Sequence, residues 1–241
     1  MGWKAFWSEI VIVVLGVAIA LAANQAVEDW SWRNKVQDGE ARLRSDVDWA
    51  FFWMAEHYAT NPCVQAQLVS LTTHLMQRGA DFAPVPVHSD VSTSRFVVRI
   101  PYRPYRFSVW DALVANGTAT HLPLQRHDSY GYVASEMARM RMRTEQANQL
   151  TGQLMILSHP IELDAGVRED LLANVEDLRQ RYAADAFSAQ QRLRRIVESL
   201  GTPSAQAVTA FLDESGTIRF CKQRGLPLAD WRDVYKPTAS P

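Results

Sequence analysis

The side chains best suited to bind a ligand are concentrated in one stretch, from Arg95 to Phe107. Pro101 and Pro104 hold this stretch extended and prevent it from forming a helix. Arginine guanidinium groups pair with carboxylate or phosphate, and tyrosine rings offer faces for stacking. The sequence therefore predicts a site for an anionic ligand or a lipid headgroup, formed by Arg95, Arg99, Arg103, Arg106, Tyr102 and Tyr105.

The alternative interpretation of these arginines is structural. No acid interrupts the chain between Asp90 and Asp111, so the arginines would pair with carboxylates or carbonyl groups of neighbouring helices. In either case four arginines are too few for a nucleic-acid surface. The formal net charge of −1 also gives no general attraction to nucleic acid.

Cys63 and Cys221 are the only two cysteines of the chain. No Cys-x-x-Cys or Cys/His spacing accompanies them, and His121 and His127 have no third ligand at a suitable spacing, so we expect no metal and no cofactor. The two cysteines form either one disulfide or two unrelated buried thiols. A disulfide would persist only in an oxidising compartment such as the periplasm.

Sequence patterns of catalysis are missing from the chain. It has no glycine-rich phosphate loop, no Gly-x-Ser-x-Gly and no His-Glu-x-x-His. Its acidic residues are scattered over the expected helix faces, where i,i+4 pairing or solvation accounts for them. We therefore expect a protein that is not an enzyme.

An apolar run near the N-terminus is the strongest signal in the chain. Ile10–Ala23 carries no charge, and apolar flanking residues lengthen it toward the ~20 residues that cross a bilayer. Tryptophans on both sides are typical of the two membrane interfaces: Trp3, Trp7, Trp30 and Trp32. We interpret residues 1–27 as an uncleaved transmembrane signal anchor. The alternatives are a signal peptide cleaved near Ala20-Leu21-Ala22 and a helix buried in a soluble domain.

Small residues share one face of this anchor. Gly16 and Ala20 are four residues apart, and Ala23 extends the same face. Small residues let transmembrane helices approach closely, so this face predicts self-association of the anchor. The alternative is that Gly and Ala are simply common in such helices.

Two arguments about topology disagree. Basic residues near the anchor are more numerous on its C-terminal side, which by the positive-inside rule places the domain in the cytoplasm: Lys4 on one side, and Arg33, Lys35, Arg42 and Arg44 on the other. A disulfide or a cleaved signal would instead require export. We favour a periplasmic domain on the second argument.

Apolar residues recur at helical spacing along most of the remaining chain. We expect the anchor helix to continue to Asn61-Pro62, because proline disfavours helix at the residue before it. Further helices are expected over 64–77 with a stop at Gly79, over 109–116, over 128–157, from an Asp164 cap to Leu200, and over 203–212. Near the end of the Asp164 helix, we expect Arg192, Arg194 and Arg195 to lie on a solvated face.

The segments between these helices are expected to be irregular or extended. We expect a loop over 80–94, extended chain over 96–98 and 118–122, and a strand or a helix over 217–221. The fold class is therefore all-α: a transmembrane helix continues into an elongated bundle of roughly three to five helices, with one short extended Arg/Pro/Tyr segment. We divide the chain into the anchor, a helical domain over 28–235 and a disordered tail over 236–241.

Three segments carry a resemblance to known proteins: Trp3–Glu9 with the apolar run VIVVLGVAIALAA, RPYRFSVWDALVANGTATH (Arg103–His121) and FCKQRGLPLADWRD (Phe220–Asp233). They resemble a family of uncharacterised single-pass inner-membrane proteins of Gram-negative bacteria. The resemblance spans most of the chain. It implies a bacterial inner-membrane protein and implies no activity.

These expectations favour an interaction or scaffold protein of the membrane, which uses its helix faces and associates with itself through the anchor. The alternative is a sensor-like domain that binds an anionic ligand near Arg99, Arg103 and Arg106. An enzyme is the least favoured class, because no catalytic pattern supports it.

Overall fold

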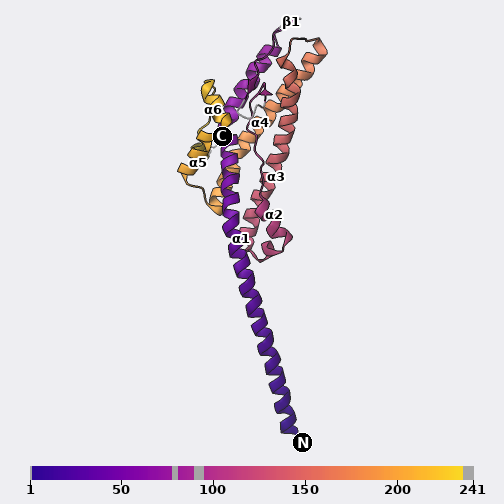
Figure 1. Ribbon diagram of the computed structural model, residues 1–241, viewed down its shortest axis with the longest axis vertical. Helices are drawn as coiled ribbons and strands as arrows, with labels where there is room; N and C mark the ends of the chain where they lie inside the picture. The colour runs from indigo at the N-terminus through magenta and orange to yellow at the C-terminus, as the bar shows by residue number, and fades with distance from the viewer. Residues whose placement is uncertain (1, 78–80, 90–94, 236–241) are drawn as a thin grey trace, which may run out of the picture.

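A computed structural model of the chain describes residues 2–77, 81–89 and 95–235 (Figure 1). One helix, α1 (Trp3–Leu75), runs the length of the molecule, and the rest of the chain packs against its C-terminal part (Figure 1). The expected tail over 236–241 and the expected helix stop at Gly79 lie outside the described residues.

The all-α prediction is confirmed. The remaining α-helices are α2 (Ser108–Ala115), α3 (Leu124–Gln153), α4 (Ala165–Leu200), α5 (Ala205–Glu214) and α6 (Gly216–Gln223). Three short 3-10 helices join them, η1 (Thr118–His121), η2 (Leu154–Ser158) and η3 (Trp231–Tyr235). Two antiparallel pairs of two-residue strands complete the described elements: β1 (Asp81–Phe82) with β4 (Ile161–Glu162), and β2 (His88–Ser89) with β3 (Arg95–Phe96).

The predicted end of the first helix at Asn61-Pro62 is wrong. α1 has 73 residues and continues through Pro62, so the segment predicted as a second helix is its last part. A proline inside a helix removes one backbone hydrogen bond and costs about 3 kcal/mol. Packing offsets that cost here, because Cys63 is fully buried and the Asn61 side chain donates a hydrogen bond to the Tyr182 carbonyl of α4.

Local capping signals were good predictors of helix ends. The Asp164 carboxylate accepts a hydrogen bond from the Val167 amide at 2.8 Å and begins α4, and Gly201, with φ of 82°, ends it. Ser215 caps α6, so the 217–221 segment is helix rather than strand. The prediction of extended chain over 118–122 is wrong, because the left-handed Gly117 reverses the chain and η1 follows it.

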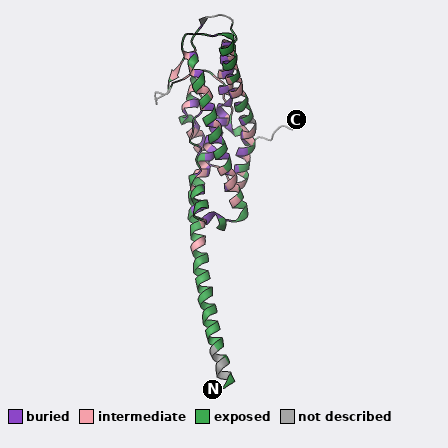
Figure 2. Cartoon of the chain, turned by 90° about the vertical axis from the view of Figure 1, so that its right-hand side faces the viewer, coloured by how far each residue is buried: buried purple, intermediate pink, exposed green. Residues whose placement is uncertain are grey.

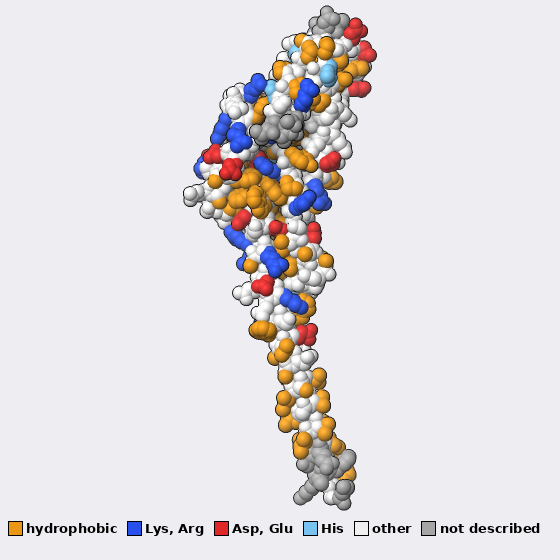
Figure 3. All heavy atoms as spheres, viewed as in Figure 1, with side chains coloured by type: hydrophobic (Ala, Val, Ile, Leu, Met, Phe, Trp, Pro, Cys, Tyr) orange, Lys and Arg blue, Asp and Glu red, His pale blue; other side chains and the backbone are white. Residues whose placement is uncertain are grey.

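None of the residues that the structure describes packs against the apolar part of α1. Residues 10–30 are all exposed, and α1 is a helix long and apolar enough to cross a membrane (Figure 2). This contradicts the alternative in which the run is buried within a soluble domain. A Cβ atom added at Gly16 would meet nothing within 4 Å, so the Gly16, Ala20 and Ala23 face is open. Figure 3 shows hydrophobic side chains along the lower, uncharged part of this helix, and charges of both signs over the domain.

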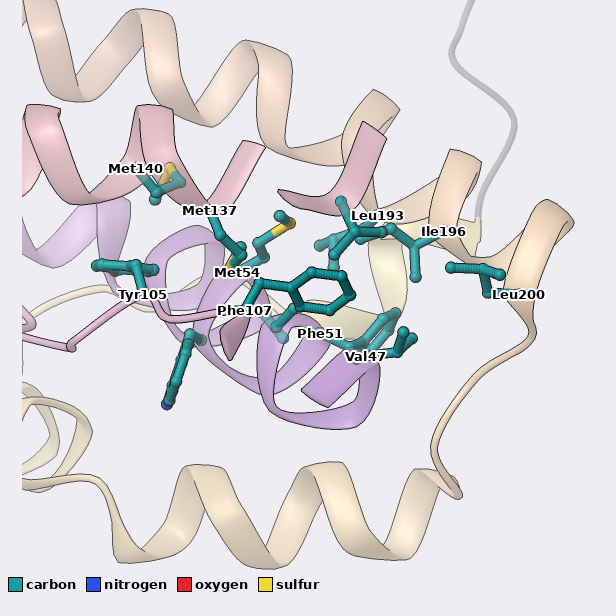
Figure 4. Packing of buried hydrophobic residues seen from close by; sticks show 14 of the residues in the cluster. Val47, Phe51, Met54, Tyr105, Phe107, Met137, Met140, Leu193, Ile196 and Leu200 are labelled. Atoms are coloured by element: carbon teal, nitrogen blue, oxygen red, sulfur yellow. The ribbon is translucent and has the colours of Figure 1, made fainter. Parts of the chain in front are cut away.

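The domain core lies between α1, α3 and α4. Figure 4 shows side chains from these helices pointing into the space between them, among them Phe51, Met137 and Ile196. The methionines at 54, 137 and 140 fill this core, as expected of gap-filling residues. A second apolar cluster, beginning at Val64 on α1, fills the end of the bundle farthest from the anchor.

Buried polar side chains lie at the junction of the two apolar clusters and extend into the first cluster. On α4, the second cluster ends at Tyr182 and the first begins at Leu193. We call these side chains the polar layer: Thr60, Asn61, Thr144, Asp185 and Arg192 at the junction, and Glu56, His57 and Glu136 among residues of the first cluster. Burial of charged groups is costly unless they are paired and hydrogen-bonded.

Candidate functional site

Cys63 of α1 and Cys221 of α6 form a disulfide bond. Their Cα atoms are 6.0 Å apart, their sequence separation is 158 residues, and both side chains are fully buried. Of the two alternatives that the sequence left open, the structure contains the bonded one. The bond fastens α6, near the C-terminal end of the domain, to the C-terminal part of α1.

Four of the six predicted ligand-binding residues line a single cavity. This arginine cavity has a volume of about 470 Å³. Its lining includes Arg95, Arg99, Tyr102 and Arg103 from the predicted segment, with polar groups from three helices: Glu56 of α1, Asn148 and Thr151 of α3, and Gly216 and Thr217 of α6. Neither Tyr105 nor Arg106 contributes to the lining.

Tyr105 is a core residue and not a ligand-binding one, so this part of the prediction is wrong. Its side chain is 1% exposed, and its ring lies 5.8 Å from that of Trp53 in a T-shaped arrangement. Its φ of 43° lies in the left-handed region, which costs an L-residue roughly 1–2 kcal/mol. Burial of the aromatic ring offsets this strain.

The backbone of the arginine segment is fixed by Gln67 of α1. The Arg99 amide donates to Gln67 Oε1 at 2.7 Å, and Gln67 Nε2 donates to the Arg99 carbonyl at 3.1 Å. Val98 and Ile100 are buried on either side of the partly exposed Arg99, which holds the segment against the domain. This pairing fixes the position at which Arg99 enters the cavity.

The N-terminus of α6 forms one wall of the arginine cavity. Arg99 Nε donates to Thr217 Oγ1 at 3.3 Å. A Cβ atom at Gly216 would lie 3.1 Å from Arg99 Nη2, so a larger residue there would displace the guanidinium group. The positive end of the helix dipole therefore adds to the positive charge of the arginines.

The charge balance of the arginine cavity is positive. Arg103 forms a bidentate pair with Glu56, with Nε–Oε2 at 2.6 Å and Nη2–Oε1 at 2.8 Å. Hydrogen bonding to this carboxylate raises the pKa of the Arg103 guanidinium above its ordinary value. Ser215 Oγ also donates to Glu56. Glu56 is the only carboxylate among the described lining residues, and Arg103 neutralises it, so Arg95 and Arg99 give the described lining a net positive charge.

The charged members of the polar layer pair across α3 and α4. Arg192 Nε lies 2.8 Å from Glu136 Oε2, and Arg192 Nη1 lies 3.8 Å from Asp185 Oδ1. Arg143 forms a second ion pair with Asp185. Arg139 also pairs with Glu136 at 2.7 Å, so each of the two buried carboxylates contacts Arg192 and one further, more exposed arginine.

This network corrects the expectation for the basic triplet of α4. Arg192 is only 7% exposed and belongs to the bundle interior. Arg194 donates to the Val234 carbonyl at 2.7 Å, and Arg195 lies over the Tyr132 ring at 4.0 Å. A signal was present in the sequence: Arg192 lies three residues after the seam residue Ala189 and four before Ile196.

His57 lies in the polar layer, stacked on the Tyr182 ring at 5.0 Å and 3.9 Å from the Asp185 carboxylate. Burial, together with the charges of Arg192 and Arg143, lowers the pKa of the imidazole to about 4. The attraction of Asp185 for a proton on His57 is weak, because both arginines already approach that carboxylate.

The low pKa of His57 predicts acid sensitivity. Below its unfolded pKa of 6.5, the unfolded chain binds a proton that the folded chain does not, so stability is complete above that pH and falls as pH falls toward about 4. The expected loss from this group is about 3 kcal/mol. The measurement is urea unfolding of wild type and His57→Leu at about pH 7 and about pH 4. Equal pH dependence in both proteins would show that His57 contributes nothing.

The two other histidines singled out in the sequence lie against tryptophan rings. The His121 ring stacks on Trp32 with centroids 3.9 Å apart, and the His127 ring lies 5.3 Å from that of Trp110. Among residues 2–77, 81–89 and 95–235, no three ligand-type side chains are grouped to hold a metal ion.

Comparison with known proteins found no matching family model, curated protein or solved structure. What the arginine cavity can bind is therefore argued from its residues, its charges and its dimensions.

Proposed function

We propose that this protein is a single-pass inner-membrane protein whose exported domain binds a small carboxylate- or phosphate-bearing ligand in the arginine cavity. The observation that carries the proposal is the gathering of Arg95, Arg99 and Arg103 around one cavity whose single described carboxylate is already paired. Guanidinium groups are well suited to recognise planar oxyanions. The domain would act as a sensor-like binding module.

The position of the cavity along α1 favours a soluble ligand over a headgroup of the anchoring membrane. Glu56, which lines the cavity, follows Val27 by 29 residues, a rise of roughly 44 Å at ~1.5 Å per residue. The headgroup layer is only about 5–8 Å thick on each side of the bilayer. A lipid in the same membrane would not reach the arginines of an upright domain.

The disulfide supports a periplasmic location for the domain. A buried bond between Cys63 and Cys221 forms and persists in an oxidising compartment. The count of basic residues after the anchor argues for the cytoplasm, but it is a statistical bias, whereas a reducing compartment acts on the bond itself. We therefore give the disulfide more weight.

Binding is expected to depend on the arginines that line the cavity. Arg95→Gln and Arg99→Gln should each weaken anion binding at least about tenfold, because a charge-assisted hydrogen bond contributes about 1.5–3 kcal/mol. The measurement is the thermal shift of the full-length protein in detergent with phosphate, citrate and other di- and tricarboxylates. Arg106→Gln is the matched control, because this exposed arginine lies in the same segment but outside the cavity lining.

Two results would contradict the binding proposal. One is that no anion stabilises the wild-type protein. The other is that Arg106→Gln weakens binding as much as Arg95→Gln, which would mean that only the total charge of the segment matters.

The second candidate function is an interaction or scaffold role. An aromatic patch supports it: Trp49 is 45% exposed, and the partly buried Phe52 stacks on Phe211 of α5 with ring centroids 5.2 Å apart. Figure 3 shows hydrophobic side chains gathered at mid-height of the domain, where α5 lies in Figure 1. Reversible crosslinking in membranes, comparing wild type with Trp49→Ala, tests this candidate. A protein that stays monomeric and captures nothing would count against it.

A further inference from the structure

The end of the domain nearest the anchor is formed by the last turn of α2, by η1 and by the first turn of α3 (Figure 1). We call this region, residues 114–124, the foot. Its height along α1 is fixed by an aromatic contact: the His121 ring of η1 stacks on Trp32 with centroids 3.9 Å apart. The Lys35 ammonium group lies over the same indole at 4.1 Å.

The foot lies within one headgroup layer of the end of the apolar run. Trp32 follows Val27, the last residue of the predicted anchor, by five residues, a rise of roughly 7.5 Å. The headgroup region adds about 5–8 Å to each side of a ~30 Å hydrocarbon core. The His121 stacking contact is therefore level with the outer headgroups of a bilayer that α1 crosses.

The foot exposes apolar side chains that the domain core does not use. Leu124, the first residue of α3, is 77% exposed, the highest value of any large hydrophobic residue among those described. Val114, at the end of α2, is 53% exposed, and Trp30 of α1 is 65% exposed. Burying a leucine side chain stabilises by roughly 1.5–3 kcal/mol, so a surface that leaves one in water gains from an apolar partner.

Charge does not explain attraction of the foot to a membrane. The adjacent stretches 28–42 and 108–128 contain six acids and four basic residues: Glu28, Asp29, Asp38, Glu40, Asp111 and Asp128 against Arg33, Lys35, Arg42 and Arg126. An excess of acids repels anionic lipids. The apolar and aromatic side chains must supply the attraction, and the resulting contact should be insensitive to salt.

We propose that the foot is a membrane-contact surface, on which Leu124 enters the headgroup layer of the bilayer that α1 spans, together with Trp30 of α1. Indole rings favour the interfacial region, and an apolar leucine at the same surface adds buried area. The domain is then held to the bilayer at two separated points, the transmembrane part of α1 and the foot. Two points of attachment keep the domain upright. The inference rests on the membrane anchoring in the proposed function and is independent of the anion site.

Site-specific fluorescence in vesicles tests the foot. The two native cysteines are bonded to each other, so a single added cysteine is the one thiol that a polarity-sensitive dye labels without reductant. Full-length Leu124→Cys is labelled and reconstituted in phosphatidylethanolamine/phosphatidylglycerol vesicles that contain lipids with a quencher near the headgroup. Val27→Cys is the control for insertion of the anchor. Met142→Cys is the matched control for exposure, because Met142 is 55% exposed on the same helix, roughly 27 Å farther along α3.

The expected result is that the dye at 124 is quenched and blue-shifted, as at 27, while the dye at 142 stays unquenched. Raising the salt from about 0.1 M to about 1 M should leave the quenching at 124 unchanged. If the dye at position 27 is quenched but the dye at position 124 stays as unquenched as the dye at position 142, the foot does not touch the membrane although the anchor is inserted. If the dye at position 27 is not quenched, both the anchor assignment and the proposal for the foot are wrong. Loss of quenching at high salt would also overturn the proposal, because it would indicate electrostatic adsorption.

Discussion

Replacing both Cys63 and Cys221 with alanine is expected to lower the free energy of unfolding of the domain by about 5 kcal/mol. The bond joins residues 158 positions apart, and a closed loop of this length strongly restricts the unfolded chain. A loss of that size is comparable with the whole stability of many domains. The measurement is guanidinium unfolding of the full-length protein in detergent, followed by far-UV circular dichroism.

Reductant provides the control for the disulfide prediction. Because the chain contains no other cysteine, a reducing agent should destabilise the wild-type protein to the level of the double variant and leave that variant unchanged. A wild-type protein that is equally stable with and without reductant would mean that the bond is not formed in the protein as isolated. Labelling with a mass-shifting maleimide, before and after reduction, would count the free thiols directly.

The same bond should affect ligand binding. Cys221 belongs to α6, whose first residues, Gly216 and Thr217, line the arginine cavity. Fastening α6 to α1 therefore keeps this wall beside Arg99. An exported domain would gain both stability and a preformed site from one bond.

Arg192→Met is expected to lower the free energy of unfolding by about 3–5 kcal/mol. Arg192 is 7% exposed and pairs with Glu136, which is 3% exposed, and with Asp185. Removing the guanidinium group leaves two buried carboxylates with Arg143 and Arg139, both more exposed, as their remaining basic partners. Each carboxylate that loses its buried partner carries a large desolvation penalty. Urea unfolding of wild type and variant at neutral pH measures the difference.

A surface pair on the same helix is the matched control for Arg192. Arg181 pairs with Asp177 at 2.8 Å with both side chains 45% exposed, so Arg181→Met should change stability by less than about 1 kcal/mol. The double variant Arg192→Met/Glu136→Leu should recover part of the lost free energy of unfolding. It removes, together with the arginine, one of the two buried carboxylates that would lose this partner. Similar losses in Arg192→Met and Arg181→Met would refute the buried role of Arg192.

The polar layer gives the bundle an arrangement that apolar packing alone does not specify. Two apolar clusters could slide or repack with little change in buried area, whereas the pairs between α3 and α4 are satisfied in one register. His57 of α1 lies 3.9 Å from the Asp185 carboxylate, so α1 also contacts this polar layer. The acid sensitivity predicted for His57 and the stability loss predicted for Arg192→Met therefore test two parts of one network.

Signals that act over a few residues were sufficient to predict much of the fold. The uninterrupted apolar run, the helical spacing of apolar residues and the Asp164 and Gly201 caps predicted an all-α chain with a long N-terminal helix. The Arg/Pro/Tyr segment was correctly recognised as non-helical, because proline restricts its own backbone and that of its neighbour. These properties belong to the local sequence, and no distant contact is needed to express them.

Distant contacts decided the rest. Pro62 should have ended a helix, but the packing of α4 and the disulfide at Cys63 carry α1 past it. Tyr105 looked like a ligand-binding residue, but a left-handed backbone turns it into the core.

The cavity and the polar layer are properties of the tertiary structure alone. Arg103 pairs with Glu56 at a sequence separation of 47 residues, and Arg192 pairs with Glu136 at a separation of 56 residues. No local spacing in the sequence predicts these pairs. The sequence by itself determined most of the helical segments and the positions of the charged residues along the chain. Packing of α1, α3, α4 and α6 determined which charges are buried against each other and which line the arginine cavity, because burial is a property of neighbours in space and not in the chain.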